Sequence, residues 1–109
     1  MHDHEVEVRI ASKEIPSDER IERMSRLYKV FGDPTRLRVL MLLSSGRLCV
    51  KAICELLEMS QSAVSHQLKN LKDNRLVGCE RSGKEVFYFL LDDHVGKIIS
   101  QGREHVEEE

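Results

Sequence analysis

Apolar residues recur every three or four positions along much of the chain, which is the spacing of one face of an α-helix. The first such face comprises Ile21, Met24, Leu27, Tyr28 and Phe31. Ser17 or Asp18 can cap the start of this helix, and Gly32 ends it. Asp33 and Pro34 then predict the start of a second helix, because aspartate accepts free N–H groups and proline has none to lose there.

The second helix is apolar over most of its surface and ends at residues 44–46. Its apolar residues are Leu37, Val39, Leu40, Met41, Leu42 and Leu43. A helix of this composition is expected at the centre of the core.

A helix-turn-helix arrangement is predicted after residue 49. A short helix at about residues 50–57 precedes a tight turn at residues 58–60, and Ser60 caps a longer helix that runs to about Asn74. The longer helix has a narrow apolar stripe of Val64, Leu68 and Leu71, and the rest of its surface is polar with little acid. A short helix, a short turn and a polar-faced helix are typical of this DNA-binding motif.

Two strands are predicted at residues 76–80 and 86–90, with a turn at residues 81–84 that carries two cations. A basic hairpin directly after a helix-turn-helix is typical of a wing. Asp92 or Asp93 then caps a last helix, whose apolar residues are Val95, Ile98, Ile99 and Val106.

The predicted fold is mostly α with a small β-hairpin wing: a winged helix-turn-helix in the order α-α-α-α-β-β-α. Residues 1–16 are expected to form a polar, flexible N-terminal arm, and residues 17–109 a single DNA-binding and dimerisation domain. The outer helices cannot bury their apolar faces fully on so small a core. We therefore expect a two-fold homodimer.

The composition argues against a membrane-spanning, a secreted or a disulfide-rich protein. The chain has 109 residues, 40% hydrophobic and 33% charged, and no apolar run approaches the roughly 20 residues that span a bilayer. The acidic start of the chain does not resemble a secretory signal. Three cysteines, at positions 49, 54 and 79, do not suggest a disulfide framework. We expect a cytoplasmic protein that does not bind a membrane.

The net charge of −2 conceals a basic middle of the chain. Residues 23–84 carry twelve basic and five acidic side chains, whereas both ends are acidic. Such a middle segment can bind double-stranded DNA, although charge alone fits an ordinary solvated surface equally well. The residues expected to contact DNA are Gln61, Ser62, Ser65, His66 and Lys69 on the polar helix, with Arg81 and Lys84 on the wing.

Four residues of the last helix form a candidate metal site: Asp92, His94, His105 and Glu108. His94 and His105 face the same side of the helix, but eleven residues of helix span roughly 16 Å, so they cannot share one ion. Two antiparallel copies in a dimer can bring the opposite ends together and form two equivalent sites. Two nitrogens and two oxygens suit tetrahedral Zn²⁺, and Co²⁺ or Ni²⁺ also accept them. Solvated charges and helix caps explain the same residues equally well.

In four stretches the sequence resembles the ArsR/SmtB family of metal-sensing repressors. These stretches are residues 31–38, 48–50, 60–68 and 75–77, and the likeness covers about residues 20–108. The spacing of the four candidate ligands is similar to that of the C-terminal zinc site of the SmtB and CzrA branch. The resemblance implies a homodimeric repressor that binds operator DNA without metal. Zinc binding would then release the DNA and derepress metal-efflux or metal-sequestration genes.

The resemblance also implies two finer features. A hydrogen bond from the ligand His105 to the backbone at Arg75 would couple the metal site to the DNA-binding helix. A second metal site, known in relatives, would use His2 and His4 of the arm with Cys49 of the partner subunit. The match at this second site is partial, since the arm has no cysteine, and we expect the site to be absent or non-functional.

Two other readings remain open at this point. The chain could sense thiol oxidation or a soft metal through Cys49 and Cys54, or it could be a winged-helix interaction module that does not bind DNA. An enzyme is the least favoured reading, because four ligands leave zinc no open position for water and the sequence has no Gly-rich phosphate loop.

Overall fold

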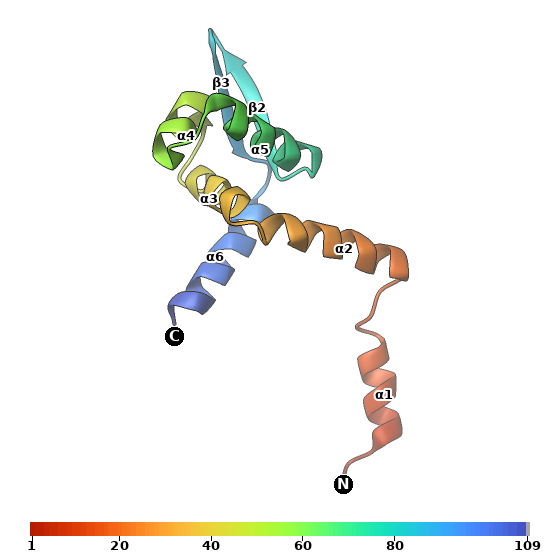
Figure 1. Cartoon of the computed structure of the whole chain (residues 1–109). Coiled ribbons are helices and arrows are strands. Elements are labelled where there is room, and N and C mark those ends of the chain that lie inside the picture. The colour runs from red at the N-terminus through yellow and green to blue at the C-terminus, as the bar shows by residue number, and fades with distance from the viewer. Residues whose placement is uncertain (109) are drawn as a thin grey trace.

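The computed structural model describes residues 1–108; Glu109, the last residue of the predicted domain, lies outside the described residues. In chain order the elements are α1 (His4–Ser12), α2 (Asp18–Phe31), α3 (Pro34–Leu43), β1 (Leu48–Cys49), α4 (Val50–Leu57), α5 (Gln61–Asp73), β2 (Val77–Ser82), β3 (Glu85–Leu90) and α6 (Asp93–Glu107). None of the helices over residues 1–108 is both long and apolar enough to cross a membrane. Figure 1 shows α3, α4 and α5 gathered beside the hairpin, with α6 extending away below them.

The predicted helix starts are confirmed, and four of them, those of α2, α3, α5 and α6, are set by a side-chain bond within three residues. Asp33 Oδ2 accepts the backbone N–H of Arg36 at 2.9 Å, with Pro34 at the first helical position. Ser60 Oγ accepts the N–H of Ala63 at 3.2 Å at the start of α5. Ser17 and Asp92 cap α2 and α6 in the same way.

The core lies around α3, as its composition predicts. Val39 and Leu40 of α3 are completely buried, and α3 packs against α2, α4, α5, α6 and β3. The full set of buried apolar residues is Val30, Val39, Leu40, Leu43, Ile53, Val64, Leu68, Leu71, Leu76, Val77, Val95 and Ile99. No aromatic residue is among them, so the core of the described chain is aliphatic.

The sheet has three antiparallel strands in the order β1-β3-β2, one strand more than the sequence predicts. The additional strand, β1, pairs Leu48 with Tyr88 of β3. The hairpin is also longer than predicted, since its ladder continues to the pair of Ser82 and Glu85. Only Gly83 and Lys84 remain in the turn, and Gly83 has φ +65°, as a two-residue hairpin turn beginning with glycine requires.

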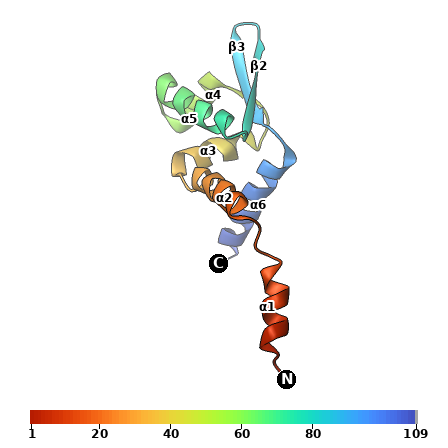
Figure 2. The ribbon, with the colours of Figure 1, turned by 90° about the vertical axis from the view of Figure 1, so that its right-hand side faces the viewer.

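The N-terminal arm contains a helix, α1, which the sequence analysis did not predict. Asp3 caps it by accepting the N–H of Glu5 at 3.0 Å and that of Val6 at 3.2 Å. None of the residues of α1 is buried. Figures 1 and 2 show α1 projecting away from the rest of the chain. The division of the chain into an arm and a domain at residue 16 stays a prediction.

A matched pair of glycine substitutions tests the packing of the hairpin. A Cβ at Gly78 would lie 2.8 Å from the Phe89 ring, whereas a Cβ at Gly96 of α6 would lie 3.8 Å from its nearest neighbour, Leu90. We expect Gly78→Ala to lower the free energy of unfolding by about 1 kcal/mol or more, because the ring must move. Gly96→Ala should raise it by up to about 1 kcal/mol. Urea unfolding measures both, and equal effects at the two positions would contradict the strand packing.

Candidate DNA-binding surface and metal ligands

The turn between α4 and α5 sets the angle of the helix-turn-helix. Glu58 has a left-handed backbone with φ +53°, and the N–H of Met59 bonds to the carbonyl of Cys54 at 3.1 Å. This pattern ends α4 tightly, so the cap Ser60 follows within two residues. The predicted turn at residues 58–60 is confirmed, and α4 and α5 pack directly against each other.

Helix α5 has one buried and one free face. Val64, Leu68 and Leu71 are completely buried. Every residue of α5 predicted to contact DNA is exposed, namely Gln61, Ser62, Ser65, His66 and Lys69, and Ser62, His66 and Lys69 lie opposite the buried stripe. The exposed face therefore offers hydroxyl, amide, imidazole and ammonium groups to a partner and no carboxylate until Asp73. Gln67 differs from these residues, since it is half-buried and its Oε1 has no hydrogen-bond partner among the described residues.

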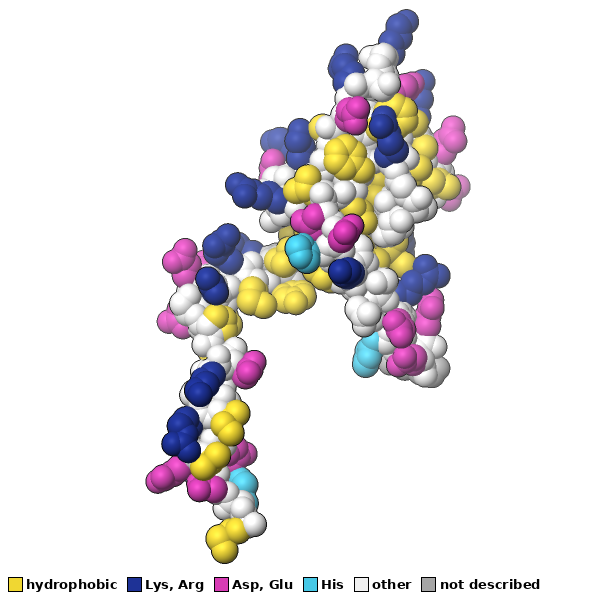
Figure 3. Space-filling view, turned by 180° about the vertical axis from the view of Figure 1, so that it is seen from behind, with side chains coloured by type: hydrophobic (Ala, Val, Ile, Leu, Met, Phe, Trp, Pro, Cys, Tyr) yellow, Lys and Arg dark blue, Asp and Glu magenta, His cyan; other side chains and the backbone are white. Residues whose placement is uncertain are grey.

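The hairpin extends the basic surface beyond α5. Arg81 lies near the end of β2 and Lys84 in the turn, and both are exposed. Figure 3 shows Lys and Arg side chains at the tip of the hairpin, at the top of the molecule. Midway along the hairpin, Arg47 stacks 4.3 Å from the centre of the Phe87 ring and lies 3.6 Å from a carboxylate oxygen of Glu80. The predicted wing therefore presents its cations at the end farthest from the core.

A contact that the sequence analysis missed joins α5 to the wing. Lys72 Nζ lies 3.2 Å from Cys79 Sγ, and this interaction raises the pKa of Lys72. Across the ladder from Cys79, burial raises the pKa of Tyr88, which packs against the core. Nothing in the residue types indicates this contact, because it depends on how the turn after α5 folds β2 back.

That turn places Arg75 in a left-handed conformation with φ +58°. The N–H of Arg75 bonds to the carbonyl of Lys72, and that of Leu76 to the carbonyl of Leu71, each at 3.0 Å. These two bonds satisfy the last carbonyls of α5 and set the direction in which β2 leaves. The predicted link from His105 to Arg75 is not formed within one chain, since no hydrogen bond over residues 1–108 joins them.

The candidate metal ligands lie at the two ends of α6. Asp92 Oδ1 accepts the N–H of His94 at 2.9 Å and lies 3.2 Å from the Nδ1 of the same residue, so these two side chains already lie together. His105 and Glu108 lie in or just after the last turn of the helix, and all four residues are exposed. Across residues 1–108, no group of three or more His, Cys, Asp or Glu side chains is close enough to hold an ion. One chain therefore does not bring the four predicted ligands together, as the length of the helix requires.

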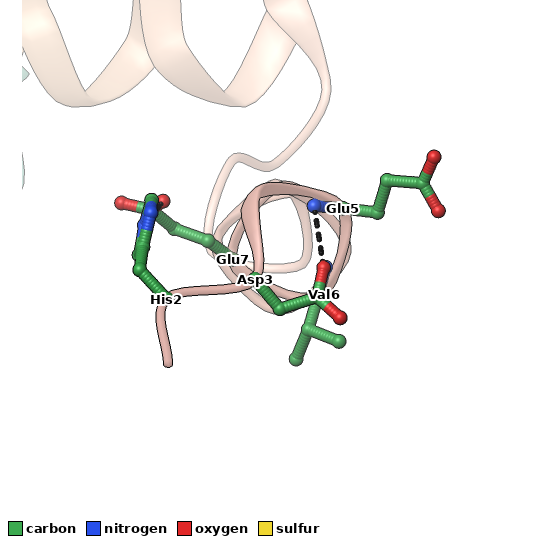
Figure 4. Close-up of polar contacts among 5 residues, drawn as sticks. All are labelled: His2, Asp3, Glu5, Val6 and Glu7. Atoms are coloured by element: carbon green, nitrogen blue, oxygen red, sulfur yellow. Dashed lines mark hydrogen bonds and ion pairs between the residues drawn. The ribbon is translucent and has the colours of Figure 1, made fainter.

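The second predicted metal site is likewise not assembled within one chain. His4 is the first residue of α1, and His2 precedes the helix and contacts Glu7 in it (Figure 4). Cys49 is half-buried in β1, next to α4, and Figure 1 places α4 far from the N-terminus. Cys54, the other cysteine of the thiol hypothesis, is half-buried and packs against the core.

Comparison with known proteins places this arrangement in a family. A family described as "Bacterial regulatory protein, arsR family" matches residues 33–78. A transcriptional repressor SmtB homolog from Synechocystis is 35% identical over 96% of this chain and 80% of that protein. A cadmium resistance transcriptional regulatory protein CadC homolog from Staphylococcus aureus is 30% identical over 96% of this chain and 87% of that protein.

Solved structures agree with this assignment. The solution structure of apo-NmtR superimposes with a TM-score of 0.76 and 33% identity, covering 87% of this chain and 81% of that chain. A homodimeric winged helix-turn-helix DNA-binding domain from Mycobacterium bovis gives a TM-score of 0.77 and 26% identity, covering 86% and 90%. The predicted winged helix-turn-helix fold is therefore confirmed. The chain belongs to the ArsR family of bacterial regulatory proteins.

Proposed function

We propose that this chain is a metal-responsive transcriptional repressor. Its homodimer binds operator DNA in the metal-free state, and Zn²⁺ binding at the ends of α6 lowers the DNA affinity and derepresses metal-resistance or efflux genes. The relatives support this class of function, because their names denote an SmtB-type repressor and a cadmium resistance regulator. These names denote regulators of transcription rather than enzymes.

One observation carries the DNA-binding part of the proposal: α5 buries one stripe completely and exposes a polar surface that has no carboxylate before Asp73. A single α-helix fits the major groove, and hydroxyl and amide groups bond to base edges there. Gln61, Ser62 and Ser65 lie in the first turns of α5, the part of a recognition helix that reaches bases. Arg81 and Lys84 of the wing contact phosphates or the minor groove.

Uncovered apolar surface supports the homodimer. Ile21, Met24 and Tyr28 of α2 are each about half exposed, and Val106 of α6 is 63% exposed. Between α3 and α6 lies an open apolar hollow of about 560 Å³, lined in part by Leu37, Met41, Ile98 and Val106. A two-fold partner that brings α2 and α6 against these surfaces removes them from water.

The ends of α6 supply a donor set that fits Zn²⁺. Asp92 and His94, which already lie together, provide one oxygen and one nitrogen, and His105 and Glu108 of the partner subunit provide the other two. Four such ligands suit a regulatory zinc site, and Co²⁺ and Ni²⁺ are the alternatives. The outer nitrogen of His105 then bonds to the backbone at Arg75, so that ligand orientation restrains the end of α5.

The zinc response tests this function directly. Fluorescence anisotropy on the native upstream DNA should show that zinc weakens wild-type binding at least tenfold, a coupling of about 1.4 kcal/mol. His105→Ala should bind DNA as the wild type does and lose the response, because the site loses a ligand. His4→Ala is the matched control, since it removes a histidine from the N-terminal arm and should leave the response intact.

Loss of the response in His4→Ala but not in His105→Ala would move the sensor to the second site with Cys49. Loss in Cys49→Ser or Cys54→Ser alone would favour the thiol hypothesis. Absence of DNA binding by the wild type at low salt would leave an interaction module as the function.

The wing contributes a separate, electrostatic prediction. Arg81→Ala and Lys84→Ala should each weaken binding to all DNA sequences and reduce the slope of log affinity against log salt by about one, because each removes a phosphate contact. Lys97→Ala, which removes an exposed cation from α6, is the control and should leave the slope unchanged. A salt slope unaffected by both wing variants would place the wing away from the DNA.

A further inference from the structure

The hairpin is packed at its base and exposed toward its tip. Val77, at the start of β2, is buried, Gly78 and Cys79 are half-buried, and residues 80–82 are exposed. Figures 1 and 2 show the tip standing clear of the helices. The angle between the tip and α5 therefore depends on the contacts that hold the hairpin at residues 79 and 80.

Lys72 of α5 holds one face of the hairpin. Its Nζ lies 3.2 Å from Cys79 Sγ, so α5 contacts β2 at the last half-buried residue of that strand. The hydrogen bond to Cys79 raises the pKa of Lys72, and the side chain therefore remains a charged donor. The carbonyl of Lys72 also accepts the N–H of Arg75 at 3.0 Å, in the turn that directs β2. One residue thus contacts both the turn and the strand that follows it.

Arg47 holds the opposite face of the hairpin. Successive strand residues point to opposite faces, so Glu80 points away from the face of Cys79. Arg47, which lies just before β1, stacks 4.3 Å from the centre of the Phe87 ring and lies 3.6 Å from Glu80. Phe87 is the cross-strand partner of Glu80. Two cationic side chains therefore hold the hairpin at neighbouring positions, one on each face.

We propose that Lys72 and Arg47 are positioning residues, which set the angle of the wing against α5 and do not themselves contact DNA. This inference rests on the proposed DNA binding, because the groove contacts of α5 and the phosphate contacts of the wing must be made together on one duplex. The charged groups of both residues are engaged with the hairpin. Lys69, one turn earlier on α5, forms no ion pair within residues 1–108 and is free for a phosphate.

The salt dependence of operator binding distinguishes a positioning lysine from a phosphate contact. In fluorescence anisotropy, Lys72→Met should weaken binding about threefold or more, in the range of coupling between contacting residues. The slope of log affinity against log salt should stay unchanged, and Arg47→Met should behave in the same way. Lys69→Met, the matched control on α5, should reduce the slope by about one. A reduced slope in Lys72→Met would indicate a direct DNA contact and overturn the proposal.

Combined variants test whether Lys72 acts through Cys79 and the wing. Cys79→Ala should weaken binding as Lys72→Met does, and the double variant should be no weaker than either, because both remove the same contact. In a chain that already carries Arg81→Ala and Lys84→Ala, Lys72→Met should cause no further loss. A further loss in that background would contradict a role through the wing.

Amide hydrogen exchange tests the same contact without DNA. Exchange at residues 80–85 should be faster in Lys72→Met than in the wild type, because the hairpin opens more often once the contact is lost. Lys69→Met should leave this exchange unchanged. Unchanged exchange in Lys72→Met would overturn the positioning role while leaving the DNA binding and the zinc response of the wild type intact. Absence of DNA binding by the wild type would instead overturn the proposed function.

Discussion

The complete burial of three side chains on one face of α5 is the constraint on which the rest of the structure depends. Val64, Leu68 and Leu71 have no exposed surface, and each contributes about 1.5–3 kcal/mol by leaving water. Because residues three and four apart share a face, burying this stripe turns Ser62, His66 and Lys69 to the opposite side, where all three are exposed. The core and the DNA-binding face are thus two results of one periodicity, and α5 is held firmly enough to keep its orientation on a small, aliphatic core.

Structure set by local bonds was predictable, and structure set by distant pairing was not. Asp33 and Ser60 cap helices through bonds to residues three positions later, so the sequence shows both partners together. Strand β1 escaped prediction because Leu48 becomes a strand only by pairing with Tyr88, forty positions away. Helix α1 escaped it for another reason: Val6, Val8 and Ile10 alternate with polar residues, a pattern closer to a strand than to an amphipathic helix.

For the candidate site too, the features set by local sequence could be predicted, and those that depend on distant contacts could not. Exposure of the predicted DNA-contacting residues follows from helical periodicity, and the structure confirms that exposure. The contact of Lys72 with Cys79 could not be predicted from the sequence. It depends on the left-handed backbone at residue 75, which sets the direction of β2, and arginine at this position does not indicate that conformation as a glycine would. The four candidate metal ligands could be proposed as a set but not brought together, because α6 holds His94 and His105 roughly 16 Å apart whatever the rest of the chain does.

The proposed metal site is compatible with an intact α6. Asp92 uses Oδ1 for the cap, accepting the N–H groups of His94 and Val95, and no hydrogen bond within residues 1–108 is made at its Oδ2. The same carboxylate can therefore cap the helix and still offer an oxygen to an ion, so binding need not unwind the first turn. Helix α6 packs on α3 and β3, and α3 packs on α5. Because a close-packed core does not deform smoothly, an ion at the proposed site would act on α5 by shifting α6 as a unit.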